Sequence, residues 1–121
     1  MPRHDLTGRN VLIIEDEYFL AEELATAFRE SGAVVVGPVA TVSQALAALE
    51  DCDSLDAAVL DVNLRGASVY PVADALLERH VPFVFATGYD ESELDVRFAE
   101  VPHCLKPIDI ARVKQALFGR K

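Results

Sequence analysis

Five polar side chains of this sequence directly follow short apolar runs, and together they could bind a divalent cation and a phosphoryl group. Glu15 and Asp16 follow one run, Asp61 a second, Thr87 a third and Lys106 a fourth. Carboxylate oxygens suit Mg²⁺, a hydroxyl can donate to a phosphoryl oxygen, and an ammonium can pair with it. An aspartate held beside Mg²⁺ can attack a phosphoryl group and form an aspartyl phosphate. These residue types therefore predict phosphoryl chemistry, provided that the fold brings them together.

Each of these signals also has a simpler explanation when it is taken alone. Acids after a strand can complement the dipole of the next helix, which is the explanation we favour for Glu17. Asp61 could be a turn residue, Thr87 could cap a helix, and Lys106 could be a solvated charge. Their combination, in this order and after four apolar runs, favours the functional interpretation.

Buried strands that alternate with amphipathic helices would have to position these residues. Continuous apolar runs of this length are typical of strands buried on both faces of a parallel sheet. We expect five strands, at 10–14, 34–37, 57–60, 83–86 and 103–105. Strands alternating with helical patterns indicate βαβ units, so all carboxyl ends would meet at one edge of the sheet. The sequence thus predicts that the polar residues converge there.

Five helices are expected around this sheet. The first ends at Gly32, the second begins at Thr41 with a capping box to Gln44, and the third begins near Val69, after a loop at 61–68. A short fourth helix is expected within 88–99, with Leu94 and Phe98 as its apolar pair, and the last helix ends at Gly119. The predicted buried faces consist of Phe19, Leu20, Leu24, Ala27 and Phe28; Val42, Leu46 and Leu49; Val72, Leu76 and Leu77; and Ile110, Val113, Ala116 and Leu117.

Composition and length bound the function classes. The 121 residues predict one domain at 9–119 after a flexible tail at 1–8. A net charge of −9 argues against binding to nucleic acid or to an anionic membrane, since both need clustered Lys and Arg. No apolar stretch is long enough to span a bilayer, and no signal peptide is visible. Cys52 and Cys104 are far apart in sequence and are expected to be reduced thiols, which favours a cytoplasmic protein.

Four motifs resemble those of the receiver domain of two-component response regulators, the CheY-like superfamily. They are VLIIEDE at 11–17, DVNL at 61–64, FATGY at 85–89 and KP at 106–107. The resemblance covers about residues 9–119. It implies an α/β, flavodoxin-like fold, which is a doubly wound parallel sheet of five strands in the order 2-1-3-4-5 with five helices.

The resemblance also implies roles for the site residues. Asp61 would be the phosphoacceptor, and Asp16 would ligate Mg²⁺ directly. Glu15 would assist through water, and Asn63 would offer its backbone carbonyl to the metal. Thr87, Lys106 and Pro107 complete the carried-over set, as the switch hydroxyl, the phosphoryl-binding cation and the partner of a cis Lys–Pro bond.

One position departs from the common pattern of the family. Many receivers have Tyr or Phe three residues before the lysine, where this sequence has His103. The FATGY run resembles a subgroup that lacks this aromatic residue and is associated with HWE-class histidine kinases. Either Tyr89 or His103 could take over the gating role, and the sequence leaves both open.

The predicted function is phosphorelay signalling by a stand-alone receiver. A histidine kinase or phosphotransfer protein would phosphorylate Asp61, and the fourth helix, fifth strand and fifth helix would contact a downstream protein. No enzymatic activity is expected beyond self-phosphotransfer and slow autodephosphorylation, and Leu117 and Phe118 are candidates for a homodimer contact. Two alternatives remain. One is a receiver-fold adaptor that is not phosphorylated, and the other is a small aspartyl-phosphate phosphatase, although Asp61-Val62-Asn63 lacks the second aspartate of that signature.

Overall fold

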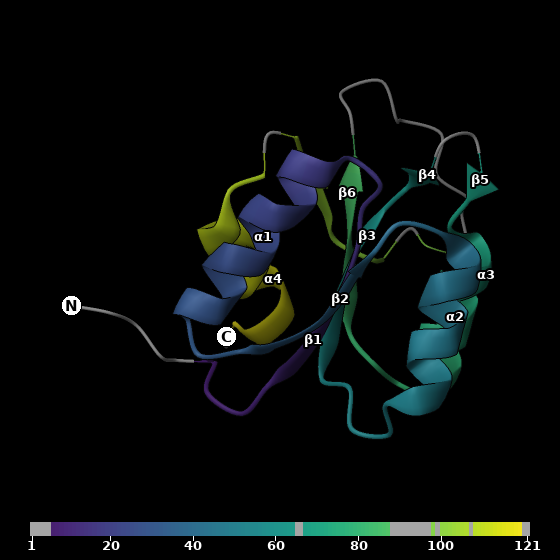
Figure 1. The fold of residues 1–121 in the computed structure, drawn as a ribbon, viewed down its shortest axis with the longest axis horizontal. Helices are drawn as coiled ribbons and strands as arrows, with labels where there is room; N and C mark the ends of the chain where they lie inside the picture. The colour runs from purple at the N-terminus through teal and green to yellow at the C-terminus, as the bar shows by residue number, and fades with distance from the viewer. Residues whose placement is uncertain (1–5, 65–66, 88–97, 99, 107, 120–121) are drawn as a thin grey trace.

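A single parallel sheet organises the molecule. The computed structural model describes residues 6–64, 67–87, 98, 100–106 and 108–119. Five strands pair in the order β2-β1-β3-β6-β7, which confirms the predicted order. Their bounds are β1 (Asn10–Ile14), β2 (Val34–Val39), β3 (Ala57–Asp61), β6 (Phe83–Thr87) and β7 (His103–Leu105). All four pairings in this sheet are parallel, so the carboxyl ends lie at one edge, at the top of Figure 1.

Helices cover both faces of the sheet. Figure 1 shows α1 (Tyr18–Glu30) and α4 (Ile110–Phe118) on one face, and α2 (Val42–Asp51) and α3 (Tyr70–Glu78) on the other. The helix expected within 88–99 lies outside the described residues, of which only Phe98 belongs to that range. The loop expected at 61–68 is wrong in part, because it contains a small antiparallel ribbon of β4 (Asn63–Leu64) and β5 (Ala67–Ser68).

Strand alternation divides the core into two clusters. Leu12 and Ile14 of β1 face the α2/α3 side, whereas Val11 and Ile13 face the α1/α4 side. The same alternation holds in β3 and β6, whose residues are all buried. The continuous apolar runs in the sequence are therefore explained by burial on both faces.

The second strand is longer than predicted. It was expected to end at Gly37, but it continues through Pro38 to Val39, whose carbonyl accepts a 2.9 Å hydrogen bond from the backbone N–H of Glu15. β2 is an edge strand, where the N–H that proline lacks is not needed for a ladder. Gly37 has a φ of +94°, and a Cβ there would lie 2.8 Å from the backbone nitrogen of Val39. The extended β2 holds the start of the Glu15–Asp16 segment.

The predicted buried faces are wrong at three positions. Phe19 is 77% exposed and Leu77 is 46% exposed, and Ala116 is also exposed. Small residues take the central places instead, among them Ala21 and Ala73. The rotation of each helix about its own axis against the sheet, which periodicity alone does not give, selects the stripe that is buried.

The folded part of the chain also begins earlier than predicted. Leu6 is buried in the α1/α4 cluster, and its N–H donates to the carbonyl of Ser31 at 2.9 Å. Leu6 therefore packs against the domain although it falls within the expected tail at 1–8, and residues 1–5 lie outside the described part. The predicted capping box is confirmed for its first bond, since the Thr41 hydroxyl accepts from the Gln44 N–H at 3.1 Å. Its second bond differs, because the Gln44 side-chain oxygen accepts from the N–H of Ala40, at 2.9 Å, and not from that of Thr41.

Candidate functional site

The polar residues predicted to converge do stand at the carboxyl edge of the sheet. Ile14 pairs with Leu60 in the β1–β3 register, so Glu15 and Asp61 leave the sheet at the same level. Asp61 pairs with Ala86. The parallel register, set by burial of both faces, is what aligns these strand ends.

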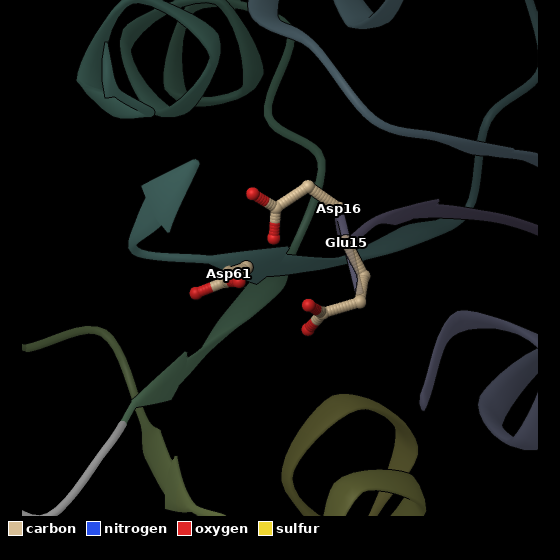
Figure 2. A group of neighbouring side chains, drawn as sticks. All are labelled: Glu15, Asp16 and Asp61. Atoms are coloured by element: carbon tan, nitrogen blue, oxygen red, sulfur yellow. The ribbon is translucent and has the colours of Figure 1, made fainter. Parts of the chain in front are cut away.

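Three carboxylates gather where β1 and β3 end. One carboxylate oxygen from each of Glu15, Asp16 and Asp61 lies within 4.8 Å of the others, and Figure 2 shows the three groups turned toward a common space. Glu15 and Asp61 are buried, and Asp16 is half-buried. Like charges this close repel one another unless a proton or a cation compensates them.

Lys106 supplies part of this compensation. Its Nζ lies 3.2 Å from Oδ2 of Asp61, to which it donates a hydrogen bond, and 3.3 Å from Oε1 of Glu15. The backbone N–H of Lys106 donates to the carbonyl of Thr87 at 2.8 Å, which holds the lysine at the end of β7 beside β6. The lysine that could have been a solvated surface charge is instead directed into the acidic cluster.

Burial and neighbouring charges shift the pKa of two members of this cluster, Glu15 and Lys106. Burial, and then the neighbouring charge of Asp61, raise the pKa of Glu15 to about 7, against the opposing effects of the Glu17 N–H and of Lys106. Burial alone would lower the pKa of Lys106, but Asp61 and Glu15 together outweigh it, so its pKa is raised and the ammonium stays charged. Near neutral pH the cluster therefore holds more negative charge than one lysine can balance.

The carboxylate set fits a hard divalent cation. Among the described residues, Oε1 of Glu15 is buried without a hydrogen-bond partner, although it lies near Lys106. An oxygen that is desolvated and not hydrogen-bonded is costly unless a ligand takes it up. Three carboxylates within reach of one another form the oxygen-rich donor set that Mg²⁺ prefers. Asn63, the fourth expected ligand, begins β4 two residues after Asp61.

The Thr87 side chain lies on the opposite face of the sheet from the contacts that Lys106 makes with Glu15 and Asp61. It is buried at the end of β6, two residues after Phe85, so both side chains belong to the α2/α3 side. Asp61 alternates with Leu60, which places its side chain toward the α1/α4 side. A group bound to Asp61 would thus have Lys106 and Thr87 as neighbours from opposite faces.

The other predicted site residues are either not described or lie elsewhere. Pro107 and Tyr89 lie outside the described residues. His103 is exposed on β7, and its ring lies 6.1 Å from that of Phe85. Sequence reasoning missed Tyr70, whose ring packs on Phe98 and Phe85, because the first residue of a helix carries no periodicity signal.

An open parallel sheet of this order, with three acids and a lysine at its carboxyl edge, defines a flavodoxin-like α/β protein with an acidic pocket where such folds place their sites. The sequence profile of the response regulator receiver domain matches residues 11–118, and the chain belongs to this family. Receiver domains are signalling domains of two-component systems, they bind Mg²⁺ at an acidic pocket, and they interact with kinases or phosphotransfer proteins.

Known proteins similar to this chain are also response regulators. An uncharacterized response regulatory protein of Vibrio cholerae is 31% identical over 113 residues, which are 89% of this chain but 46% of that protein. The chain thus spans about half the length of this relative. The solution structure of SdrG from Sphingomonas melonis is 39% identical, with a TM-score of 0.70, and covers 90% of this chain and 95% of SdrG.

Two further solved structures extend this comparison. BeF3-activated SdrG, from Pseudomonas melonis, is 44% identical with a TM-score of 0.74, over 91% of this chain and 93% of that one. PhyR from Brucella abortus is 26% identical with a TM-score of 0.71, over 90% of this chain and 47% of PhyR.

Within the part of this chain that the structure describes, no helix has the length and apolar character needed to cross a bilayer.

Proposed function

We propose that this chain is a phospho-accepting receiver in which Asp61 takes a phosphoryl group from a histidine kinase or phosphotransfer protein. One observation carries the proposal: the buried Asp61 carboxylate lies 3.2 Å from the Lys106 ammonium and within 4.8 Å of the carboxylates of Glu15 and Asp16. The free cysteines Cys52 and Cys104 agree with the cytoplasmic location that we expect for such a protein.

The transfer exchanges one bond to phosphorus for another. A carboxylate oxygen of Asp61 attacks the phosphorus, the P–N bond to the donor imidazole breaks, and its electron pair stays on that nitrogen. Lys106 then exchanges its contact with Asp61 Oδ2 for a phosphoryl oxygen, which neutralises part of the transferred charge. Mg²⁺ held by Glu15, Asp16, Asp61 and the Asn63 carbonyl would neutralise more of it.

The signal is proposed to be a population shift between two arrangements of the domain. The Thr87 hydroxyl would donate to the phosphoryl group from the face opposite to Lys106. Such a ligand shifts an equilibrium only by its difference in affinity for the two states, typically a few kcal/mol. We propose that the output surface includes β7, where Leu105 is 61% exposed, and α4. Phe118 stays a candidate for a dimer contact, whereas Leu117 is buried in the core.

The phosphodonor is proposed to dock on the first turns of α1. Tyr18 and Phe19 directly follow the acidic segment, are 68% and 77% exposed, and pack edge to face with ring centroids 5.3 Å apart. Glu22, Glu23 and Glu30 share a shallow surface depression with Phe19. An amphipathic helix that presents apolar and basic side chains is complementary to this surface.

The test is the intact mass after incubation with acetyl phosphate and Mg²⁺. We expect the wild type to gain one phosphoryl group, and we expect Asp61→Asn, or the wild type with excess EDTA, to gain none. Glu50→Gln, which removes an exposed charge from α2, is the matched control and should be labelled like the wild type. A folded, Mg²⁺-binding protein that is never labelled would favour the adaptor, and turnover of a small phosphoester would favour the phosphatase.

A further inference from the structure

Three aromatic rings form a triangle on the α2/α3 face of the sheet. The ring centroids of Tyr70 and Phe98 are 4.9 Å apart, those of Phe85 and Phe98 are 5.6 Å apart, and those of Tyr70 and Phe85 are 6.3 Å apart. Phe85 and Phe98 are fully buried, and Tyr70 is half-buried. Each ring comes from a different segment, so the triangle joins parts of the chain that are far apart in sequence.

One corner of the triangle is connected to the candidate site through β6. Phe85 and Thr87 are two residues apart on the same strand and point to the same side of the sheet. Thr87 is itself buried, with only 3% of its surface exposed. Because a packed interior has few voids, a movement of the Thr87 side chain toward a group on Asp61 has to be accommodated by the neighbours on this side.

The other two corners are connected to the two segments that flank the site. Tyr70 is the first residue of α3, and its N–H donates to the Ser68 hydroxyl at 3.1 Å, which ties it to the ribbon that follows Asp61. The carbonyl of Phe98 accepts from the Val101 N–H at 3.0 Å, directly before β7. Tyr70 therefore contacts both the strand that carries Thr87 and the segment that leads into β7.

Tyr70 is also the member of the triangle that can move at the lowest cost. Its phenol has a polar end and its side chain is already half-exposed, so it can turn toward water, whereas Phe85 and Phe98 would each have to expose a buried apolar ring. His103 projects from the exposed side of β7, and its ring lies 6.1 Å from that of Phe85. Geometry thus favours the ring on α3 over the imidazole on β7 as the mobile contact.

We propose that Tyr70 is a positioning residue that couples the state of Thr87 to Phe98 and β7. The inference rests on the proposed phosphorylation of Asp61, and it adds a route by which that event reaches the output surface. In one state the Tyr70 ring stays against Phe98, and in the other it gives up part of that contact when Thr87 moves. The competing explanation is that the triangle is only core packing.

Amide hydrogen exchange of a peptide spanning 98–106 distinguishes these explanations. Mg²⁺ with beryllofluoride, a phosphoryl mimic, should change its exchange rate in the wild type. Tyr70→Leu keeps an apolar side chain but removes the ring, and it should reduce this change by about threefold or more, the size expected for coupling between packed neighbours. Tyr70→Phe keeps the ring and should retain most of the change in exchange rate.

Phe83→Leu is the matched control. Phe83 lies on the same strand, is 4% exposed, and packs on Phe85 with centroids 5.5 Å apart, but it is four residues from Thr87. It should lower stability as Tyr70→Leu does, yet keep the response of the 98–106 peptide. In a Thr87→Ala background, Tyr70→Leu should cause no further loss, because the two residues act in series.

A second measurement needs no core substitution. The chain has three tyrosines, so 3-fluorotyrosine labelling gives three ¹⁹F signals, assigned by Tyr→Phe variants. The Tyr70 signal should shift on addition of Mg²⁺ and beryllofluoride, and the exposed Tyr18 should shift less.

The outcomes separate this inference from the proposed function. Beryllofluoride binding with an unmoved Tyr70 signal would overturn the inference alone, as would a full response in Tyr70→Leu or an equal loss in Phe83→Leu. A wild type that neither binds beryllofluoride nor accepts a phosphoryl group would overturn both.

Discussion

Replacing Glu15 by Gln should stabilise the metal-free protein at alkaline pH. The pKa of Glu15 is raised from 4.5 to about 7 by burial and by Asp61, so the folded protein holds this proton more tightly than the unfolded chain does. The free energy of unfolding should therefore fall as the pH rises from 4.5 to about 7, and this contribution should be constant above that. The glutamine side chain of the variant cannot ionise. Its carbonyl can still accept the hydrogen bond that the Glu17 N–H donates to Glu15 Oε2 in the wild type, at 3.0 Å.

The size of the effect follows from the two pKa values. The difference between a pKa of 4.5 and a pKa of about 7 corresponds to at most about 3 kcal/mol in the free energy of unfolding. This figure already includes the opposing attraction of the Lys106 ammonium, 3.3 Å from Glu15 Oε1. We expect Glu15→Gln to exceed the wild type by about 2 kcal/mol at about pH 8 and to equal it near pH 4.5.

Urea unfolding in EDTA at several pH values measures this difference. Glu23→Gln, which removes an exposed charge from α1, should follow the wild-type pH profile. Excess Mg²⁺ should narrow this difference at about pH 8, because the cation stabilises the ionised wild type by about 3 kcal/mol at a hundredfold excess over its Kd and the variant by less. If the wild type and Glu15→Gln show parallel pH profiles, the argument that the folded protein raises the pKa of Glu15 is refuted.

Three further predictions concern Lys106, α1 and a helix cap. Lys106→Met should leave two buried carboxylates without their ammonium, so it should lower stability more at pH 8 than near pH 5, where Glu15 is protonated. It should also slow labelling by acetyl phosphate. Equal losses of stability at both pH values would contradict this prediction. Phe19→Ala should change stability by less than about 0.5 kcal/mol because the ring is 77% exposed. It should nevertheless lower kcat/KM for a phosphorylated histidine phosphotransfer protein by about fivefold or more, with acetyl phosphate labelling unchanged; equal effects on both donors would argue against docking at α1. Thr41→Ala should lower the free energy of unfolding by about 1 kcal/mol in chemical denaturation through loss of the bond to the Gln44 N–H, with labelling unchanged. Ser43→Ala, at an exposed position two residues further on, serves as the control.

The local pattern of the sequence was enough to predict the scaffold and the position of the site. Apolar runs at 11–14, 57–60 and 83–86 have no polar residue to place on a solvated face, so they predict strands buried on both sides. The parallel order then follows from the alternation with helices and from the family resemblance. Glu15 and Asp61 are brought together because they directly follow two such strands.

What the tertiary structure decided concerns contacts between residues far apart in the chain. No local pattern distinguishes a solvated Lys106 from one directed at Glu15 and Asp61, because that depends on the depth at which β7 ends beside β6. Likewise, periodicity placed Phe19 on the buried stripe, since hydrophobicity repeats along a helix without showing how the helix is rotated against the sheet. The raised pKa of Glu15 depends on long-range burial as well. Local sequence specifies which elements form, whereas proximity, burial and charge at the site arise only when those elements pack.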